Sequence, residues 1–232
     1  MAVAGRLDRM ERPRLYEQVV ERLLDHVIDQ QLEPGDRMPP ERDLAESLGV
    51  SRATVAQALV ALEVLGVIDV QHGSGAVLRY RPSNAAVLRG LREHTNRLPD
   101  IVDARSAVET KIAALAAARR TEEDLERIEA ALHLMAEDID AGGRGLKGDE
   151  QFHAAVTAAA HSSVLARMMT QISDLVRETR LESLSQEGRP ERSLESHRAI
   201  VEAVRERDPA RAARAMEEHI ELVSDVAVLR PE

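Results

Sequence analysis

The apolar positions of this chain recur at helical spacing along almost its whole length. Between residues 14 and 31 they form neighbouring rows with a period of four, which predicts a first amphipathic helix. A second helix is predicted at 41–48 and a third at about 52–65. Gly49 ends the second helix, because glycine adopts the left-handed conformation easily, and Ser51 is a suitable N-cap for the third.

After the third helix the pattern becomes extended. Residues 67–70 predict a short strand, 72–75 a glycine-rich turn and 76–80 a return strand. Two helices joined by a tight turn and followed by a hairpin form a winged helix-turn-helix, in which the second of the two helices suits the major groove of DNA. Spacing alone leaves this open, because a helical hairpin with a glycine turn also occurs in other folds.

Beyond Pro82 and Ser83, which mark a boundary between domains, the pattern is helical only. Thr121 and Asp124 resemble a capping box, and Asp208-Pro209 is a clear helix start. Consecutive amphipathic helices of this kind imply a bundle. The predicted helices of this part are 85–94, 99–119, 121–141, 149–160, 162–183, 192–207 and 208–229.

The predicted fold is therefore mainly α, with an N-terminal winged helix-turn-helix that has a small β-hairpin wing, and a C-terminal all-helical bundle. We expect a disordered tail at 1–12, the winged domain at 13–81, a linker at 82–97 and the helical domain at 98–232.

Side chains suited to DNA gather around the third helix. Arg52 and Gln57 point outward near its start, where Arg52 suits a guanine edge and Gln57 an adenine edge. Ser51 and Thr54 are better suited to phosphate, and the glycines of the turn let backbone approach backbone. The predicted DNA contacts are Arg42, Ser51, Arg52, Thr54, Gln57, His72, Gly73 and Gly75.

Composition limits this picture. The net charge of −10 argues mildly against nucleic acid, and residues 1–82 hold ten Arg against thirteen acidic residues. DNA binding must then rest on a local patch of arginines, for which the candidates are Arg14, Arg37, Arg42, Arg52, Arg79 and Arg81. The chain has no Cys, which excludes disulfides and thiolate metal sites, and it shows no signal-peptide pattern or membrane-length apolar run, so we expect a cytoplasmic protein.

The helical part contains one candidate metal site. Asp149 and His153 are four residues apart and share a helix face, while His197 and His219 lie mid-helix on or near apolar stripes. One carboxylate and three imidazoles suit Zn²⁺ or another borderline divalent ion, with positions left for water or a ligand oxygen. The alternative is that these are surface or hydrogen-bonded core histidines, which is the commoner case for any single His.

The first eighty residues resemble the N-terminal domain of GntR-type bacterial transcription regulators. The matching segments include Pro34-Gly35-Asp36, Glu41-Arg42-Asp43-Leu44-Ala45, Leu48-Gly49-Val50-Ser51-Arg52 and Gly73-Ser74-Gly75. The chain departs from the family pattern at Ala56, where an Arg that takes part in DNA recognition is usual, and at Pro40, where a small polar residue is usual. The resemblance implies DNA binding, and these two departures leave the operator sequence open.

The second part resembles the FCD domain of the FadR-type branch of this family, through Asp149-x-x-Phe152-His153, Ser196-His197-Arg198 and Met216-x-x-His219. The resemblance implies a divalent metal, Zn²⁺ with Ni²⁺ or Mn²⁺ as alternatives, held by Asp149, His153, His197 and His219. It also implies a small carboxylate effector beside the metal, fixed by the guanidinium of Arg105, for which the alternative is a surface ion pair with Glu109 at i+4. Periodicity leaves open whether Arg177 and Arg180 also point inward. The departures are His161, where Asn is common, and Ser196, where Glu is common.

The main hypothesis is a homodimeric repressor on an inverted-repeat operator, whose affinity for DNA changes when a small organic acid binds. One alternative is a metal-dependent hydrolase or lyase that acts on a small organic acid. Another is a regulator with a purely structural metal. The winged domain favours the regulators, because an enzyme has no need of it.

We expect Arg52→Ala to abolish operator-specific binding while leaving the fold intact, because Arg52 is the predicted base-reading side chain. Wild-type binding should weaken steeply as salt rises, since phosphate contacts release counterions. Footprinting at several salt concentrations measures both effects. A footprint that the substitution leaves unchanged rejects the base-reading role of Arg52.

Overall fold

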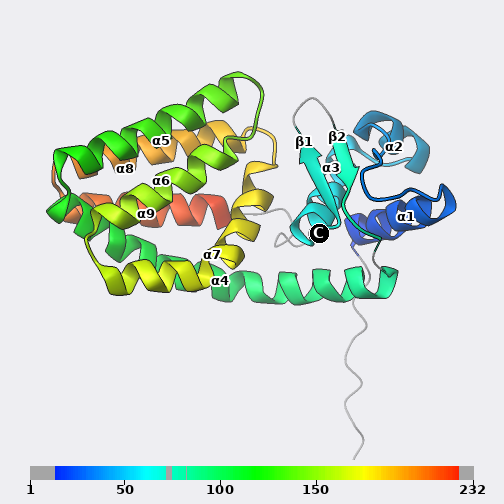
Figure 1. Ribbon diagram of the computed structural model, residues 1–232, viewed down its shortest axis with the longest axis horizontal. Coiled ribbons are helices and arrows are strands. Elements are labelled where there is room, and N and C mark those ends of the chain that lie inside the picture. The colour runs from blue at the N-terminus through cyan, green and yellow to red at the C-terminus, as the bar shows by residue number, and fades with distance from the viewer. Residues whose placement is uncertain (1–13, 72–74, 82, 225–232) are drawn as a thin grey trace, which may run out of the picture.

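The computed structural model describes residues 14–71, 75–81 and 83–224. The tail predicted at 1–12 lies outside these residues, and so do His72 and Gly73 of the predicted wing turn. Figure 1 shows two domains side by side above one long helix, the winged domain on the right and the helical domain on the left.

The N-terminal domain has the predicted order of helix, helix-turn-helix and hairpin. Ser51 caps the third helix, because its Oγ accepts a hydrogen bond from the Thr54 backbone N–H at 3.1 Å. Gly49 ends the second helix with a φ of +67°, as predicted. The elements are α1 (Leu15–Asp29), α2 (Glu41–Leu48), α3 (Arg52–Val64), β1 (Ile68–Gln71) and β2 (Gly75–Leu78).

The two strands form an antiparallel pair in which Ile68 lies opposite Leu78 and Val70 opposite Ala76. Ile68 and Leu78 are both buried, so the hairpin contributes one face to the core of the winged domain. The other side of that core comes from the apolar rows of α1 and α3, which pack against each other.

The helical domain contains six helices in the part of the chain that the structure describes: α4 (Asn84–Arg119), α5 (Glu122–Asp140), α6 (Leu146–Ala159), α7 (Ser163–Leu184), α8 (Arg189–Arg205) and α9 (Pro209–Ser224). α5 packs along α6, and α9 lies between α4 and α8 in contact with both. The capping box of Thr121 and Asp124 forms as predicted. No described helix has both the length and the apolar character needed to cross a membrane.

The predicted break between 94 and 99 is wrong, because α4 continues through it as one helix of 36 residues with Pro99 inside. Proline removes one backbone hydrogen bond from a helix, so packing must outweigh that loss. Leu91 and Leu98 are buried in the core that α4 shares with the winged domain. About one and a half turns before Pro99 on the same helix, the buried imidazole of His94 bonds Glu178 and Glu182 of α7 at 3.0 and 3.1 Å.

Two other predicted starts are wrong by three residues. α6 begins at Leu146 rather than 149, and α8 at Arg189 rather than 192. Both helices begin directly after a glycine with a φ of +72°, Gly145 and Gly188, and such a glycine gives no N-cap signal of the usual polar kind.

The close packing of α5 on α6 generates a prediction. A Cβ at Gly148 would lie 2.4 Å from the backbone N and Cα of Met135, which cannot move without shifting α5. We expect Gly148→Ala to lower the free energy of unfolding by ~3 kcal/mol or more, at the upper end of the range for overpacking.

Urea unfolding measures this effect, with Gly90→Ala as the control in another helix. A Cβ at Gly90 meets only the side chain of Leu65, at 3.1 Å or more, so this change should stay within ~1 kcal/mol of wild type. Equal stability of the two variants would contradict the backbone clash.

Candidate functional site

Three helices bring together the four residues that were predicted to hold a metal. Asp149 and His153 come from α6, His197 from α8 and His219 from α9, and all four are buried. One donor atom from each lies within 4.8 Å of the others. Tetrahedral ligands of one Zn²⁺ at ~2.1 Å lie ~3.4 Å apart, so the donor atoms would have to close by about 1.4 Å or less to hold the ion.

The remaining nitrogen of each imidazole has a partner that fixes the ring. His153 Nδ1 lies 2.6 Å from a Glu109 carboxylate oxygen, and His219 Nδ1 lies 2.8 Å from Ser196 Oγ. His197 Nδ1 lies 3.3 Å from the sulfur of Met135. The Nε2 atoms of His153 and His197 approach to 3.2 Å, as expected where two rings are aimed at a shared ion.

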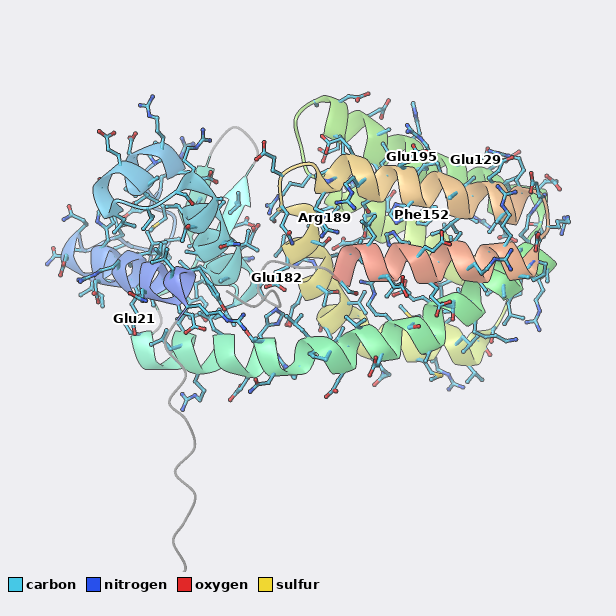
Figure 2. All side chains as sticks on the ribbon, turned by 180° about the vertical axis from the view of Figure 1, so that it is seen from behind. Glu21, Glu129, Phe152, Glu182, Arg189 and Glu195 are labelled. Carbon is cyan, nitrogen blue, oxygen red and sulfur yellow. The ribbon has the colours of Figure 1, made fainter. Side chains whose placement is uncertain are left out.

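The surroundings favour neutral imidazoles, the form that binds metals. Burial lowers the pKa of His153, and it holds the pKa values of His197 and His219 well below the ordinary value. Phe152 stacks on His197 with ring centroids 4.2 Å apart and lies inside the bundle in Figure 2. The rings therefore sit in a dry environment that disfavours their charged form.

Two arginines and two carboxylates surround the histidines. Arg105 donates from Nε to Glu109 at 2.7 Å, and Arg180 Nε lies 3.1 Å from an Asp149 oxygen. Burial alone would raise the pKa of Glu109, but the charges of Arg105 and Arg180 and the hydrogen bond with His153 outweigh it and hold that pKa well below its ordinary value. With neutral imidazoles the formal charges of these four side chains cancel.

Several buried polar atoms in this cluster have no well-aligned hydrogen bond among the described residues. They are Nη2 of Arg105, Oδ2 of Asp149, and Nε and Nη2 of Arg180. Asp149 and Arg180 still attract each other as an ion pair, but the angle between them is poor for a hydrogen bond. Buried polar atoms that lack a hydrogen-bond partner favour the presence of an ion or a ligand at this site.

A cavity of about 520 Å³ between α6 and α7 opens beside the histidines. His153 and Arg180 line it together with the charged side chains of Glu150, Asp174 and Arg177 and with apolar side chains such as Met169 and Val176. Arg105, the predicted effector residue, is buried and is not part of this lining; its Nη1 lies 3.4 Å from Thr179 Oγ1. The cavity therefore presents Arg180, rather than Arg105, to an entering molecule.

The predicted DNA contacts lie on α3 and around it. Arg52 is exposed and Gln57 half-buried, both on the outward side of α3. Ser51 and Thr54 bond each other at 2.8 Å at the start of this helix. Gly75 begins β2 with a φ of +77°, and Arg42 is exposed on α2 beside Asp43. The contacts predicted at His72 and Gly73 lie outside the described residues.

Sequence reasoning missed several side chains that surround the candidate metal site. Glu109 was recognised as a partner of Arg105 at i+4 but not as the carboxylate on His153. Arg180 gave an undecided signal, and Ser196 contacts His219 across two helices, which no local pattern reveals. His161 belongs to a helix end, because its Nε2 lies 2.8 Å from the capping residue Asp124.

Comparison with known families assigns both domains. Residues 15–78 match the model for bacterial regulatory proteins of the gntR family, and residues 100–222 match the FCD domain. The chain belongs to the GntR family. It is a DNA-binding transcriptional regulator, and the families and relatives it matches are regulators rather than enzymes.

Two relatives illustrate the similarity. The chain is 35% identical over 209 residues to the HTH-type transcriptional regulator LutR of Bacillus subtilis, covering 84% of this chain and 93% of LutR. It is 31% identical over 221 residues to the Exu regulon transcriptional regulator of Escherichia coli, covering 91% and 83% of the two chains. The solved structure of Streptococcus agalactiae GntR is 28% identical, with a TM-score of 0.48 over 90% of this chain and 98% of that one.

The geometry of the histidines generates a prediction about metal binding. We expect His197→Ala to reduce affinity for Zn²⁺ by more than the ~10–100-fold typical of losing an outer partner, and Ser196→Ala to fall within that range. Isothermal titration and metal content after dialysis measure both.

His133→Ala is the control, because His133 is exposed on α5 and pairs only with Glu137 among the described residues. Circular dichroism verifies that each variant is folded. Metal content that stays unchanged in folded His197→Ala rejects His197 as a ligand.

Proposed function

We propose that this GntR regulator senses a small organic acid at a divalent metal held by Asp149, His153, His197 and His219. The observation that carries the proposal is the convergence of the four donor atoms, with each imidazole fixed from its other side. The donor set of three nitrogens and one carboxylate oxygen suits Zn²⁺ first, with Ni²⁺ or Mn²⁺ as alternatives.

The charges around the cluster favour an anionic effector. Arg105 and Arg180 balance Glu109 and Asp149, so a divalent ion would leave about two positive charges in a buried site. A carboxylate or dicarboxylate would reduce that excess, and Arg180 and His153 both line the cavity beside it. We infer that Arg180 contacts the acid directly and that Arg105, behind it, supports the site or contacts a second carboxylate.

The regulatory output follows from DNA binding. A homodimer would place two winged domains on an inverted-repeat operator, matching protein symmetry to DNA symmetry. The acid changes operator affinity only through different affinities for the free and DNA-bound conformations. We propose that acid binding lowers operator affinity and so releases the protein, acting as a repressor, from DNA. Because the operator would lie on chromosomal DNA, the protein would act in the cytoplasm.

A purely structural metal is the second candidate, because an ion at this position would tie α6, α8 and α9 together in a buried core. The two candidates differ in whether an acid adds stability beyond that of the metal. They also differ in whether Arg180 contacts a ligand, because in a structural site it would only pair with Asp149 and Glu109.

A thermal-shift screen against small carboxylic acids, with and without a chelator, separates these candidates. An acid at a hundredfold its dissociation constant should add ~2.7 kcal/mol and raise Tm by several degrees, and the chelator should remove this shift. Arg180→Gln should lose the shift, whereas Arg167→Gln, exposed on the same helix, should keep it. Destabilisation by the chelator without a shift from any acid would support the structural metal and contradict acid sensing.

A further inference from the structure

The outward side of α3 faces the helical domain across a cleft of about 740 Å³. Arg52, Ala56, Gln57 and Val60 line one wall. The other wall consists of residues 142–144, from the loop after α5, and a stretch from the end of α7 to the start of α8. Figure 2 shows Glu182 and Arg189 on the edge of the helical domain that faces the winged domain.

This cleft is too small for the target of α3. A volume of about 740 Å³ is typical of a pocket for a small molecule. A recognition helix must instead enter a major groove ~12 Å wide, with a whole duplex on its outward side. The two base-reading candidates, Arg52 and Gln57, therefore cannot reach bases while residues 142–144 stand opposite them.

One ion pair spans the domains at the far end of α3. Arg144 donates from both terminal nitrogens to the two carboxylate oxygens of Glu63, each at 3.0 Å, in a bidentate arrangement. Arg144 also donates to Ser185 Oγ at 2.6 Å and to the Val70 carbonyl at 3.4 Å, and Glu63 accepts from the Val70 N–H at 3.2 Å. The Glu63 side chain is only 9% exposed and that of Arg144 26%, so solvent screens the pair incompletely.

Arg144 and its partner Ser185 are both close in sequence to the candidate metal site. Arg144 precedes Asp149 by five positions, and Ser185 follows Arg180 by five positions. Asp149 and Arg180 are themselves an ion pair that joins α6 to α7. A change in that pair therefore reaches Arg144 and its partner Ser185 through little more than one turn of helix on each side.

We propose that the Arg144–Glu63 ion pair holds the regulator in a closed state in which the helical domain covers the DNA-reading side of α3. DNA binding requires this pair to break and the cleft to open. The closed state follows from the cleft and the DNA-binding role of the family alone. The further step, in which acid binding at Asp149 and Arg180 shifts the equilibrium between closed and open states, rests on the proposed function.

The first test is the affinity of full-length Arg144→Ala for DNA. The probe is the duplex that the wild-type protein selects from a randomised 30-base-pair pool. If the closed state predominates, loss of the pair raises the binding-competent fraction, and we expect affinity to rise ~5-fold or more. Removal of a positive charge by itself weakens DNA binding, so an increase cannot arise from net charge.

Arg192→Ala is the control matched for charge, because Arg192 is exposed and lines the same cleft. It should bind with unchanged or weaker affinity. An affinity of Arg144→Ala equal to that of Arg192→Ala would overturn the proposed role of the ion pair.

The second test locks the cleft. The chain has no Cys, so the double variant Glu63→Cys, Arg144→Cys can be bridged specifically with a short bismaleimide. The bridged protein should lose at least ~10-fold in affinity relative to the same variant capped with N-ethylmaleimide. Equal affinity of the bridged and capped forms would show that opening is not required. Neither test uses an acid or a metal. Both therefore test the closed state even if the protein does not sense an acid at a metal.

Discussion

The helical domain depends on the mutual neutralisation of charges that water hardly reaches. Arg105, Glu109, Asp149 and Arg180 are each at most 9% exposed. Removing one member of such a group leaves an uncompensated buried charge, which costs several kcal/mol. The four side chains must therefore be kept together, and because they come from α4, α6 and α7, their pairing fixes how these three helices pack. The histidines add polar atoms to the same core without adding charge, since burial keeps their rings neutral.

The same helices that carry this cluster also end beside the winged domain. α6 begins just after Arg144, and α7 ends just before Ser185, so the candidate metal site and the contact with Glu63 share two helices. A rigid element that meets two sites can couple them without an additional signalling path. α3 also packs directly against α7, which brings the DNA-reading helix within one layer of the cavity beside Arg180.

Local chemistry determined most of what could be predicted. The turn from Gly49 to Ser51, the capping box at Thr121 and the start at Asp208-Pro209 were all correct, because each depends on residues a few positions apart. The course of α4 through Pro99 depends on burial of Leu98 and on the bonds of His94 to α7, which single-sequence patterns do not contain. The four metal-ligand candidates could be found from their spacing and from the resemblance. The contacts of Glu109, Arg180 and Ser196 could not, because they join different helices and arise only when these helices pack together.

The continuity of α4 has a mechanical consequence. A single helix of 36 residues contributes Val87 and Leu91 to one core and Ile112 to the other. The two domains are therefore joined by a continuous helix and not by a flexible linker. Separation of the domains must then bend or rotate α4. Pro99 lies between the two cores and supplies no N–H to the Thr95 carbonyl, which makes it the weakest position in the backbone ladder. The residue that failed to end the helix is thus placed where a pivot would be.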